Sequence, residues 1–118
     1  MRRPKNCISV AKAKALQKNW NDTRALGLEK TRGFKEINAV TFNIDQLQEF
    51  IDYVKSESAS QRIANPGIRV YFAAYNNALS DRATVFLNAT ENDGGNSANN
   101  YGIDPLNFGT NGWPPEAY

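Results

Sequence analysis

The sequence predicts an α+β fold in which two amphipathic helices pack on one face of a small sheet, followed by an irregular tail containing proline and glycine. Two segments, 9–24 and 44–58, repeat apolar residues at helical spacing. Two runs of β-branched and aromatic residues, 68–75 and 83–90, alternate at the strand period. The loop between these runs is short enough for an antiparallel hairpin, and a short strand near residue 40 completes the predicted sheet.

The length and composition predict one globular domain over residues 1–118, with a loose basic terminus over residues 1–8. No apolar run approaches the roughly 18 residues that a membrane-spanning helix needs. The basic start is not followed by an apolar segment, so we expect no signal peptide. The single cysteine, Cys7, cannot form a disulfide within the chain, and these features together predict a cytoplasmic protein.

The chain contains no histidine, which removes the usual general acid and base near neutral pH and the commonest metal ligand. It also excludes the Ser-His-Asp and Cys-His arrangements of nucleophilic enzymes. With a single cysteine, a zinc or iron–sulfur site is excluded as well, so any metal site would have to use oxygen ligands only, as for calcium or magnesium. We therefore expect a protein that is not an enzyme and that carries no cofactor and no metal.

Charge is distributed unevenly along the chain. Residues 1–35 hold ten of the fourteen Lys and Arg residues and two acids, a net charge of +8, whereas residues 36–118 hold four bases and ten acids, a net charge of −6. The basic third is compatible with binding a phosphate backbone or an anionic membrane surface. The interpretation we favour is internal complementarity between the basic helix and the acidic one.

The first predicted helix begins at the N-cap Ser9 and ends near Arg24, with Gly27 as its stop signal and a connection over residues 28–35. One narrow stripe of this helix is apolar and is expected to face the core; it consists of Val10, Ala13, Leu16 and Trp20. At this spacing Trp20 is more typical of a core anchor than of a ligand-binding residue.

A short strand over residues 37–42 precedes the second helix, in which Asn43 and Gln46 form a capping box. The core stripe of this helix consists of Ile44, Leu47, Phe50, Ile51 and Val54. Three acids on its other side, Asp45, Glu49 and Asp52, are interpreted as solvated rather than catalytic. The short strand is expected to belong to the same small sheet as the hairpin, and if it pairs with the strand at 68–75 the crossover through the second helix makes the pair parallel and right-handed.

The predicted hairpin has two different faces. Its aliphatic face is expected to pack on the helix at 44–58; it consists of Ile68, Val70, Phe72, Ala74, Val85, Leu87 and Ala89. Its mixed face exposes too much aromatic area to be left wholly in water. Together with one residue of the tail, this face is the predicted interaction surface, which consists of Arg69, Tyr71, Tyr75, Phe86 and Trp113.

Residues 91–102 are predicted to form a flexible loop rich in Asn and Gly. An EF-hand reading fails, because Asp93 is followed by two glycines and the third ligand position has no oxygen-bearing side chain. Residues 103–118 form a tail with prolines and aromatic residues, which would either pack on the domain as a lid or serve as a handle for a partner. We favour the lid, because the mixed hairpin face offers an internal surface for it to cover.

Several segments resemble a family of small uncharacterised proteins of flavobacteria and related bacteria. The resemblance rests on ISVAKAKALQKNW, AVTFNIDQLQEFIDYVKSES, GIRVYFAAY, TVFLNAT and DPLNFGTNGWPP, which cover most of the chain in the same order. It implies a shared fold with a strand-then-helix block, a hairpin and a Gly/Pro-containing tail. It implies no activity, cofactor or catalytic residue.

The function predicted from these features is a small protein-interaction or accessory module that binds another protein or a second copy of itself. Nucleic-acid binding is the alternative, with bases stacking on Tyr71, Tyr75 and Phe86 beside Arg69. This alternative is weaker, because most of the basic charge lies in the N-terminal third rather than beside the aromatic face. A histidine-free enzyme is the least favoured reading.

Overall fold

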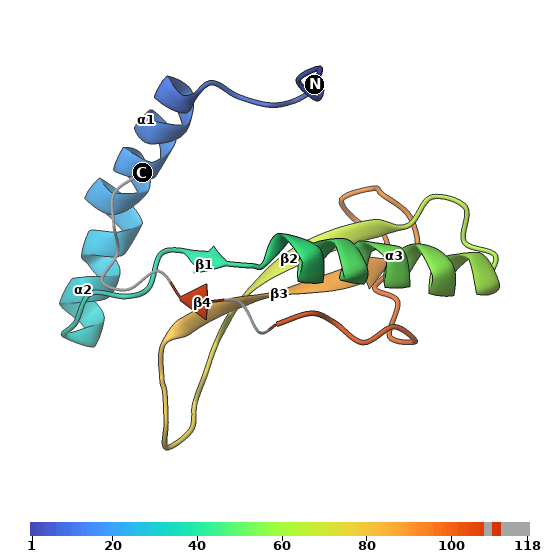
Figure 1. Ribbon diagram of the computed structural model, residues 1–118. Coiled ribbons are helices and arrows are strands. Elements are labelled where there is room, and N and C mark those ends of the chain that lie inside the picture. The colour runs from blue at the N-terminus through green and yellow to red at the C-terminus, as the bar shows by residue number, and fades with distance from the viewer. Residues whose placement is uncertain (108–109, 112–118) are drawn as a thin grey trace. The chain divides into compact units, whose positions relative to one another are not determined.

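The computed structural model describes residues 1–107 and 110–111, and its architecture is α+β (Figure 1). Contacts within the chain divide the described residues into two units, Met1–Asn38 and Ala39–Asn111. The first unit is helical, and the second combines a helix with two antiparallel strand pairs.

The first unit is a continuous helical run in three parts: α1 (Val10–Trp20), a π-helical turn (Asn21–Ala25) and α2 (Leu26–Arg32). The predicted N-cap is confirmed, because the Ser9 hydroxyl accepts a hydrogen bond from the Lys12 amide at 3.0 Å. The predicted stop at Gly27 is wrong, since Gly27 lies inside α2 and the run ends at Gly33. A single glycine within a helix costs only about 1 kcal/mol, so it does not have to end one. Gly33 has a φ of 80°, the left-handed conformation that glycine tolerates best at a helix C-terminus.

The apolar stripe predicted for the first helix is not buried, and α1 contains no buried residue. Val10 and Leu16 are more than half exposed, and Trp20 is 37% exposed. The packing of this helix on the sheet therefore stays a prediction.

The second unit contains the helix α3 (Ile44–Ser60), which begins as predicted: the side-chain oxygen of Asn43 accepts a hydrogen bond from the Gln46 amide at 3.0 Å. The short strand β1 (Val40–Thr41) pairs with β4 (Thr110–Asn111) in antiparallel orientation. The prediction that this strand belongs to the hairpin sheet is wrong, because β1 and β4 form a two-stranded sheet of their own. The chain returns at β4 to supply the partner, and an antiparallel pair formed in this way needs no crossover connection.

The predicted hairpin is confirmed. Strands β2 (Gly67–Ala74) and β3 (Ala83–Thr90) pair in antiparallel register, with Val70 opposite Leu87. The Tyr75 amide donates to the Arg82 carbonyl at 3.0 Å. This bond shows which residues of β2 form the hydrogen-bonded pairs of the ladder. Because such pairs alternate, the odd-numbered residues of β2 bond to β3, and the backbone groups of the even-numbered residues point to the outer edge of β2.

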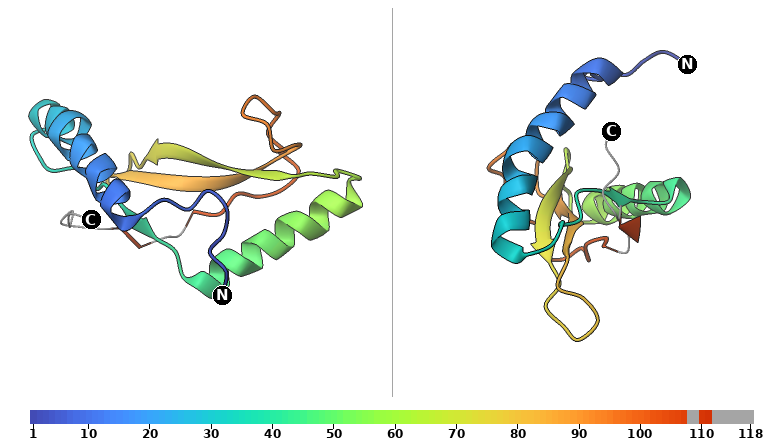
Figure 2. Two further views of the ribbon diagram at one scale, coloured as in Figure 1. Left: turned by 90° about the horizontal axis from the view of Figure 1, so that it is seen from above. Right: turned by 90° about the vertical axis from the view of Figure 1, so that its left-hand side faces the viewer.

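The segment from residue 98 to residue 106 runs along the outer edge of β3 and acts as an irregular third strand. Leu87 and Leu106 exchange both backbone hydrogen bonds, at 2.8 and 3.0 Å, and the Asn100 amide donates to the Ala89 carbonyl at 2.9 Å. In Figure 2 this segment follows β3 on the side away from β2. The order across the second unit is therefore β2, β3, segment 98–106.

The core of the second unit lies between α3, β3 and the segment 98–106. Its buried apolar residues are Phe50, Val54, Leu87, Ala89 and Ile103, with Phe42, Leu47 and Leu106 packed against them. Ile103 is only 1% exposed, so the start of the predicted tail is a core element of this unit. Residues 108–109 and 112–118 of that tail lie outside the described residues.

Candidate functional site

The predicted interaction surface is only partly brought together. Arg69, Tyr71 and Phe86 lie on one face of the hairpin, where the rings of Tyr71 and Phe86 stack with their centroids 5.0 Å apart. Tyr75 lies further along the same strand direction, and its hydroxyl donates to the Asn107 side-chain oxygen at 2.9 Å. Trp113 lies outside the described residues.

Arg69 connects the Asn/Gly-rich segment to the hairpin through hydrogen bonds. Its guanidinium donates to the Asn99 side-chain oxygen at 2.8 Å, to the Ser97 carbonyl at 2.9 Å and to the Gly95 carbonyl at 3.1 Å. These are charge-assisted bonds, which are among the stronger hydrogen bonds in proteins. The guanidinium is therefore committed to the protein's own backbone and amide groups rather than presented to solvent.

The segment predicted to be flexible carries further specific hydrogen bonds. The Asn92 carbonyl accepts from the hydroxyls of Thr90 and Ser97, at 2.6 and 2.8 Å. The Asn100 side chain donates to the Gln61 side-chain oxygen at 2.7 Å, which connects the segment to the end of α3. Short polar side chains of this kind replace a regular ladder with local bonds to the backbone.

The Tyr71 hydroxyl is polarised by its neighbours. The Asn99 amide nitrogen donates to it at 2.7 Å. Hydrogen bonding from Asn99, and secondarily from Arg69, lowers the pKa of Tyr71 below its ordinary value of 10.0, because both donors favour the phenolate. The same donors make the neutral phenol a stronger hydrogen-bond donor toward an outside acceptor.

A hollow of about 440 Å³ opens beside this hydroxyl. Aromatic rings, amide groups and one carboxylate line it: Tyr71, Phe86, Asn88, Asn99, Tyr101, Ile103, Asp104 and Pro105. Tyr101 is 88% exposed, so one wall of the hollow is open to solvent. The lining offers flat apolar surface, a few amide groups and three titratable side chains, Tyr71, Tyr101 and Asp104.

On the opposite face of the hairpin, the predicted packing of β2 against α3 is wrong. Ile68, Val70 and Phe72 were expected to pack on α3, but they are 39%, 53% and 90% exposed, whereas their neighbours Leu87 and Ala89 on β3 are buried. A helix is about 10 Å across and strands lie about 4.8 Å apart, so one helix covers about two strands. Here α3 covers β3 and the segment 98–106, and β2 is left outside.

The same three residues lie on an open edge. The structure pairs β2 with β3 only, and within the described residues of the second unit no strand bonds to its other side. The backbone groups of Ile68, Val70 and Phe72 point toward that side, as the ladder alternation requires. We call this set the open edge: the outer backbone of β2 together with the side chains of Ile68, Val70 and Phe72.

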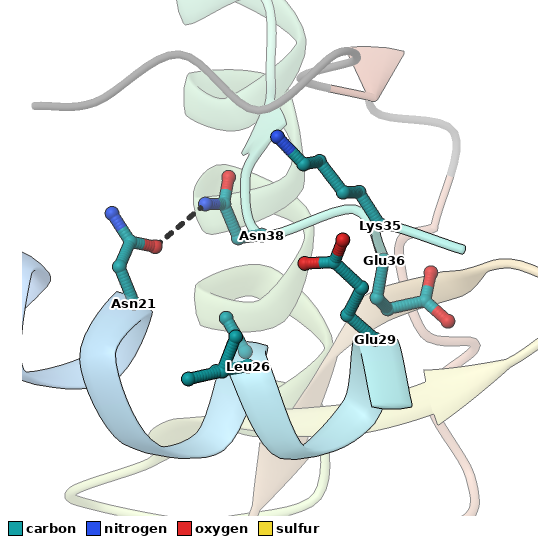
Figure 3. Close-up of a pocket in the computed structure, with 7 residues that line it drawn as sticks. Asn21, Leu26, Glu29, Lys35, Glu36 and Asn38 are labelled. Atoms are coloured by element: carbon teal, nitrogen blue, oxygen red, sulfur yellow. Dashed lines mark hydrogen bonds between the residues drawn. The ribbon is translucent and has the colours of Figure 1, made fainter. Parts of the chain in front are cut away.

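A second hollow, of about 200 Å³, lies in the first unit beside the π-helical turn. The residues that line it are Asn21, Ala25, Leu26, Glu29, Lys35, Glu36 and Asn38. Figure 3 shows Asn21 and Asn38 joined by a hydrogen bond of 3.3 Å, with the charged side chains of Glu29, Lys35 and Glu36 on the other side. The Asn38 side-chain oxygen is buried, and it has no hydrogen-bond partner among the described residues.

Residues 1–107 and 110–111 contain no group of three or more His, Cys, Asp or Glu side chains that could hold a metal ion. In the same part of the chain, no helix combines the length and the apolar character required to cross a membrane.

Comparisons with family models, with curated proteins and with solved structures gave no match. The resemblance to small flavobacterial proteins therefore stays a prediction.

Proposed function

We propose that this chain is a small, non-catalytic protein-interaction module, and that its binding element is the open edge of β2. In this proposal an extended segment of a partner adds to the hairpin as a further strand. The observation that carries the proposal is the coincidence, on one strand, of outward-pointing backbone groups with exposed apolar side chains, Phe72 being 90% exposed.

Strand addition uses both features of the open edge. The main-chain hydrogen bonds supply affinity, and alternate side chains supply specificity. Even-numbered residues of β2 provide both, because Ile68, Val70 and Phe72 share one face and direct their backbone groups outward.

The edge also lacks the usual protection against pairing. Natural proteins guard exposed edges with lysines, prolines or bulges. Within Gly67–Ala74 the sequence has one charged residue, Arg69, which lies on the opposite face and bonds to the segment 95–99. An unguarded apolar strand of eight residues is a liability unless it is covered in use, which supports a role in binding.

The mixed face supports binding less well. Its arginine is engaged by Asn99, Ser97 and Gly95, and it would have to release them to reach a phosphate. Nucleic-acid binding thus stays the weaker alternative. The exposed, unpaired thiol of Cys7 is compatible with the cytoplasmic location that we propose.

The test uses a peptide with the sequence GIRVYFAA, carrying a fluorophore and extra lysines at both ends for solubility. We expect it to bind the dilute full chain, and we expect Val70→Lys to weaken binding at least tenfold, which corresponds to about 1.4 kcal/mol. The matched control is Ile44→Lys, since Ile44 is 79% exposed and belongs to α3 rather than to β2.

A second peptide, with proline in place of the central valine, separates strand addition from general stickiness. Proline lacks the N–H donor that a ladder requires, so this peptide should bind far more weakly. Equal binding of both peptides, or equal loss in the Val70→Lys and Ile44→Lys variants, would contradict the proposed function.

A further inference from the structure

We infer that the strand added at the open edge is β2 of a second copy of this chain, paired in antiparallel orientation with Val70 opposite Val70. This inference rests on the proposed function and names its partner. The two hairpins would then form one continuous sheet across a two-fold axis, the commonest symmetry of soluble homo-oligomers.

The odd–even alternation of hydrogen-bonding residues along β2 restricts how two copies can pair. Even-numbered residues of β2 direct their hydrogen-bonding groups outward, so even residues must face even residues across the new interface. With Val70 on the axis, Ile68 lies opposite Phe72 of the second copy, and Phe72 opposite Ile68. All three large apolar side chains then meet apolar partners, and aromatic–β-branched pairs are among the favourable cross-strand combinations.

Charge and backbone chemistry favour this register over its neighbours. It sets Arg69 opposite Tyr71, an uncharged aromatic residue. A shift that centres the axis on Arg69 sets two like charges opposite each other and brings Pro66, which has no N–H donor, opposite Phe72. A shift that centres it on Tyr71 pairs Ile68 with Ala74 and loses one large apolar contact.

The register predicts which engineered cysteines will cross-link. Directly opposed residues in a hydrogen-bonded pair have Cα atoms about 5.5 Å apart, within the range that a disulfide spans. The native thiol is first removed by Cys7→Ser. In that background Val70→Cys should give a cross-linked dimer with oxidised glutathione. Phe72→Cys should not, because the two positions would be about 14 Å apart, four residues at about 3.4 Å each.

Light scattering on the full chain provides the second measurement. We expect its mass to rise from one chain to two as the concentration increases, and we expect Val70→Lys to raise the dimer dissociation constant at least tenfold. The control Ile44→Lys should leave it unchanged. Circular dichroism checks that each variant keeps its fold.

The outcomes separate this inference from the proposed function. A chain that remains a monomer at every concentration, yet binds the strand peptide, overturns the second-copy inference and leaves the open edge as a site for a different protein. A dimer that cross-links through Phe72→Cys, or that Val70→Lys does not weaken, overturns the edge pairing. A chain that remains a monomer and does not bind the peptide overturns both the second-copy inference and the proposed function.

Discussion

The two outer edges of the hairpin differ in whether another segment of the chain covers them. The edge of β3 is covered by the chain's own segment 98–106, which bonds to it at Leu87 and Ala89. The edge of β2 carries a comparable apolar content, and no described strand of the same unit covers it. Leu87 and Ala89 are 8% and 0% exposed, against 53% and 90% for Val70 and Phe72.

This contrast shows that composition does not decide which strand becomes the core. Both strands look equally suited to burial, and the difference lies in what covers them. One helix covers about two strands. Here α3 covers β3 and the neighbouring segment 98–106, so β2 is left uncovered. The strand left outside is the one to which we assign binding.

The largest expected effect comes from breaking the covered edge. Ile103→Ala removes a side chain that is 1% exposed and that belongs to the segment over β3. We expect the free energy of unfolding to fall by about 2–5 kcal/mol, from lost transfer energy and the cavity left behind. Denaturant unfolding followed by circular dichroism measures it.

The matched control for this variant is Ile68→Ala on the open edge, where Ile68 is 39% exposed. The two changes delete the same atoms, so the difference between the two losses of stability measures how much more a covered residue contributes than an exposed one. Equal losses of stability in dilute protein would show that the two edges do not differ in the way described here.

A smaller effect concerns the pKa of Tyr71, which reports whether the cover is in place. Hydrogen bonding from Asn99 and Arg69 lowers this pKa below 10.0 in the folded chain. Between the lowered value and the unfolded value, the unfolded state holds more protons, so stability should rise with pH through that window and lose this contribution below it. Ultraviolet titration of tyrosinate, compared with that of the Tyr71→Phe variant, measures the shift.

Asn99→Ala removes the main cause of that shift, and the pKa of Tyr71 should move back toward 10.0. Asn96→Ala, a change at an exposed position just before this segment, serves as the control and should leave the titration unchanged. A Tyr71 titration that is identical in both variants would mean that segment 98–106 does not hold Asn99 against the hairpin in solution.

Much of the local structure follows from the sequence because its signals are local. The caps at Ser9 and Asn43, the buried positions Phe50 and Val54 of α3 and the pairing of β2 with β3 depend on nearby residues and regular periods. The stripe was predicted one residue too long, because Ile44 at the start of α3 is 79% exposed. The helix end at Gly33 was harder to predict, since Gly27 offers the same residue type. Only the left-handed conformation at Gly33 distinguishes the two.

The candidate site divides in the same way. Strand alternation was enough to bring Arg69, Tyr71 and Phe86 onto one face. Their partners in the segment 92–107 could not be predicted, because short polar residues bond through individual geometries and have no period. The open edge was missed for a related reason: a polar segment without strand character took the place of a third strand.

Residue-resolved amide hydrogen exchange along β2, in the dilute full chain, tests most directly whether the outer edge of this strand is open. The amides of Arg69, Tyr71 and Ala73 bond to β3 and should be protected, whereas those of Val70 and Phe72 should exchange rapidly. Adding the strand peptide, or raising the protein concentration, should slow exchange at Val70 and Phe72. Uniform protection of all five amides in the dilute chain would show that the edge is already covered, and would contradict its assignment as a binding edge.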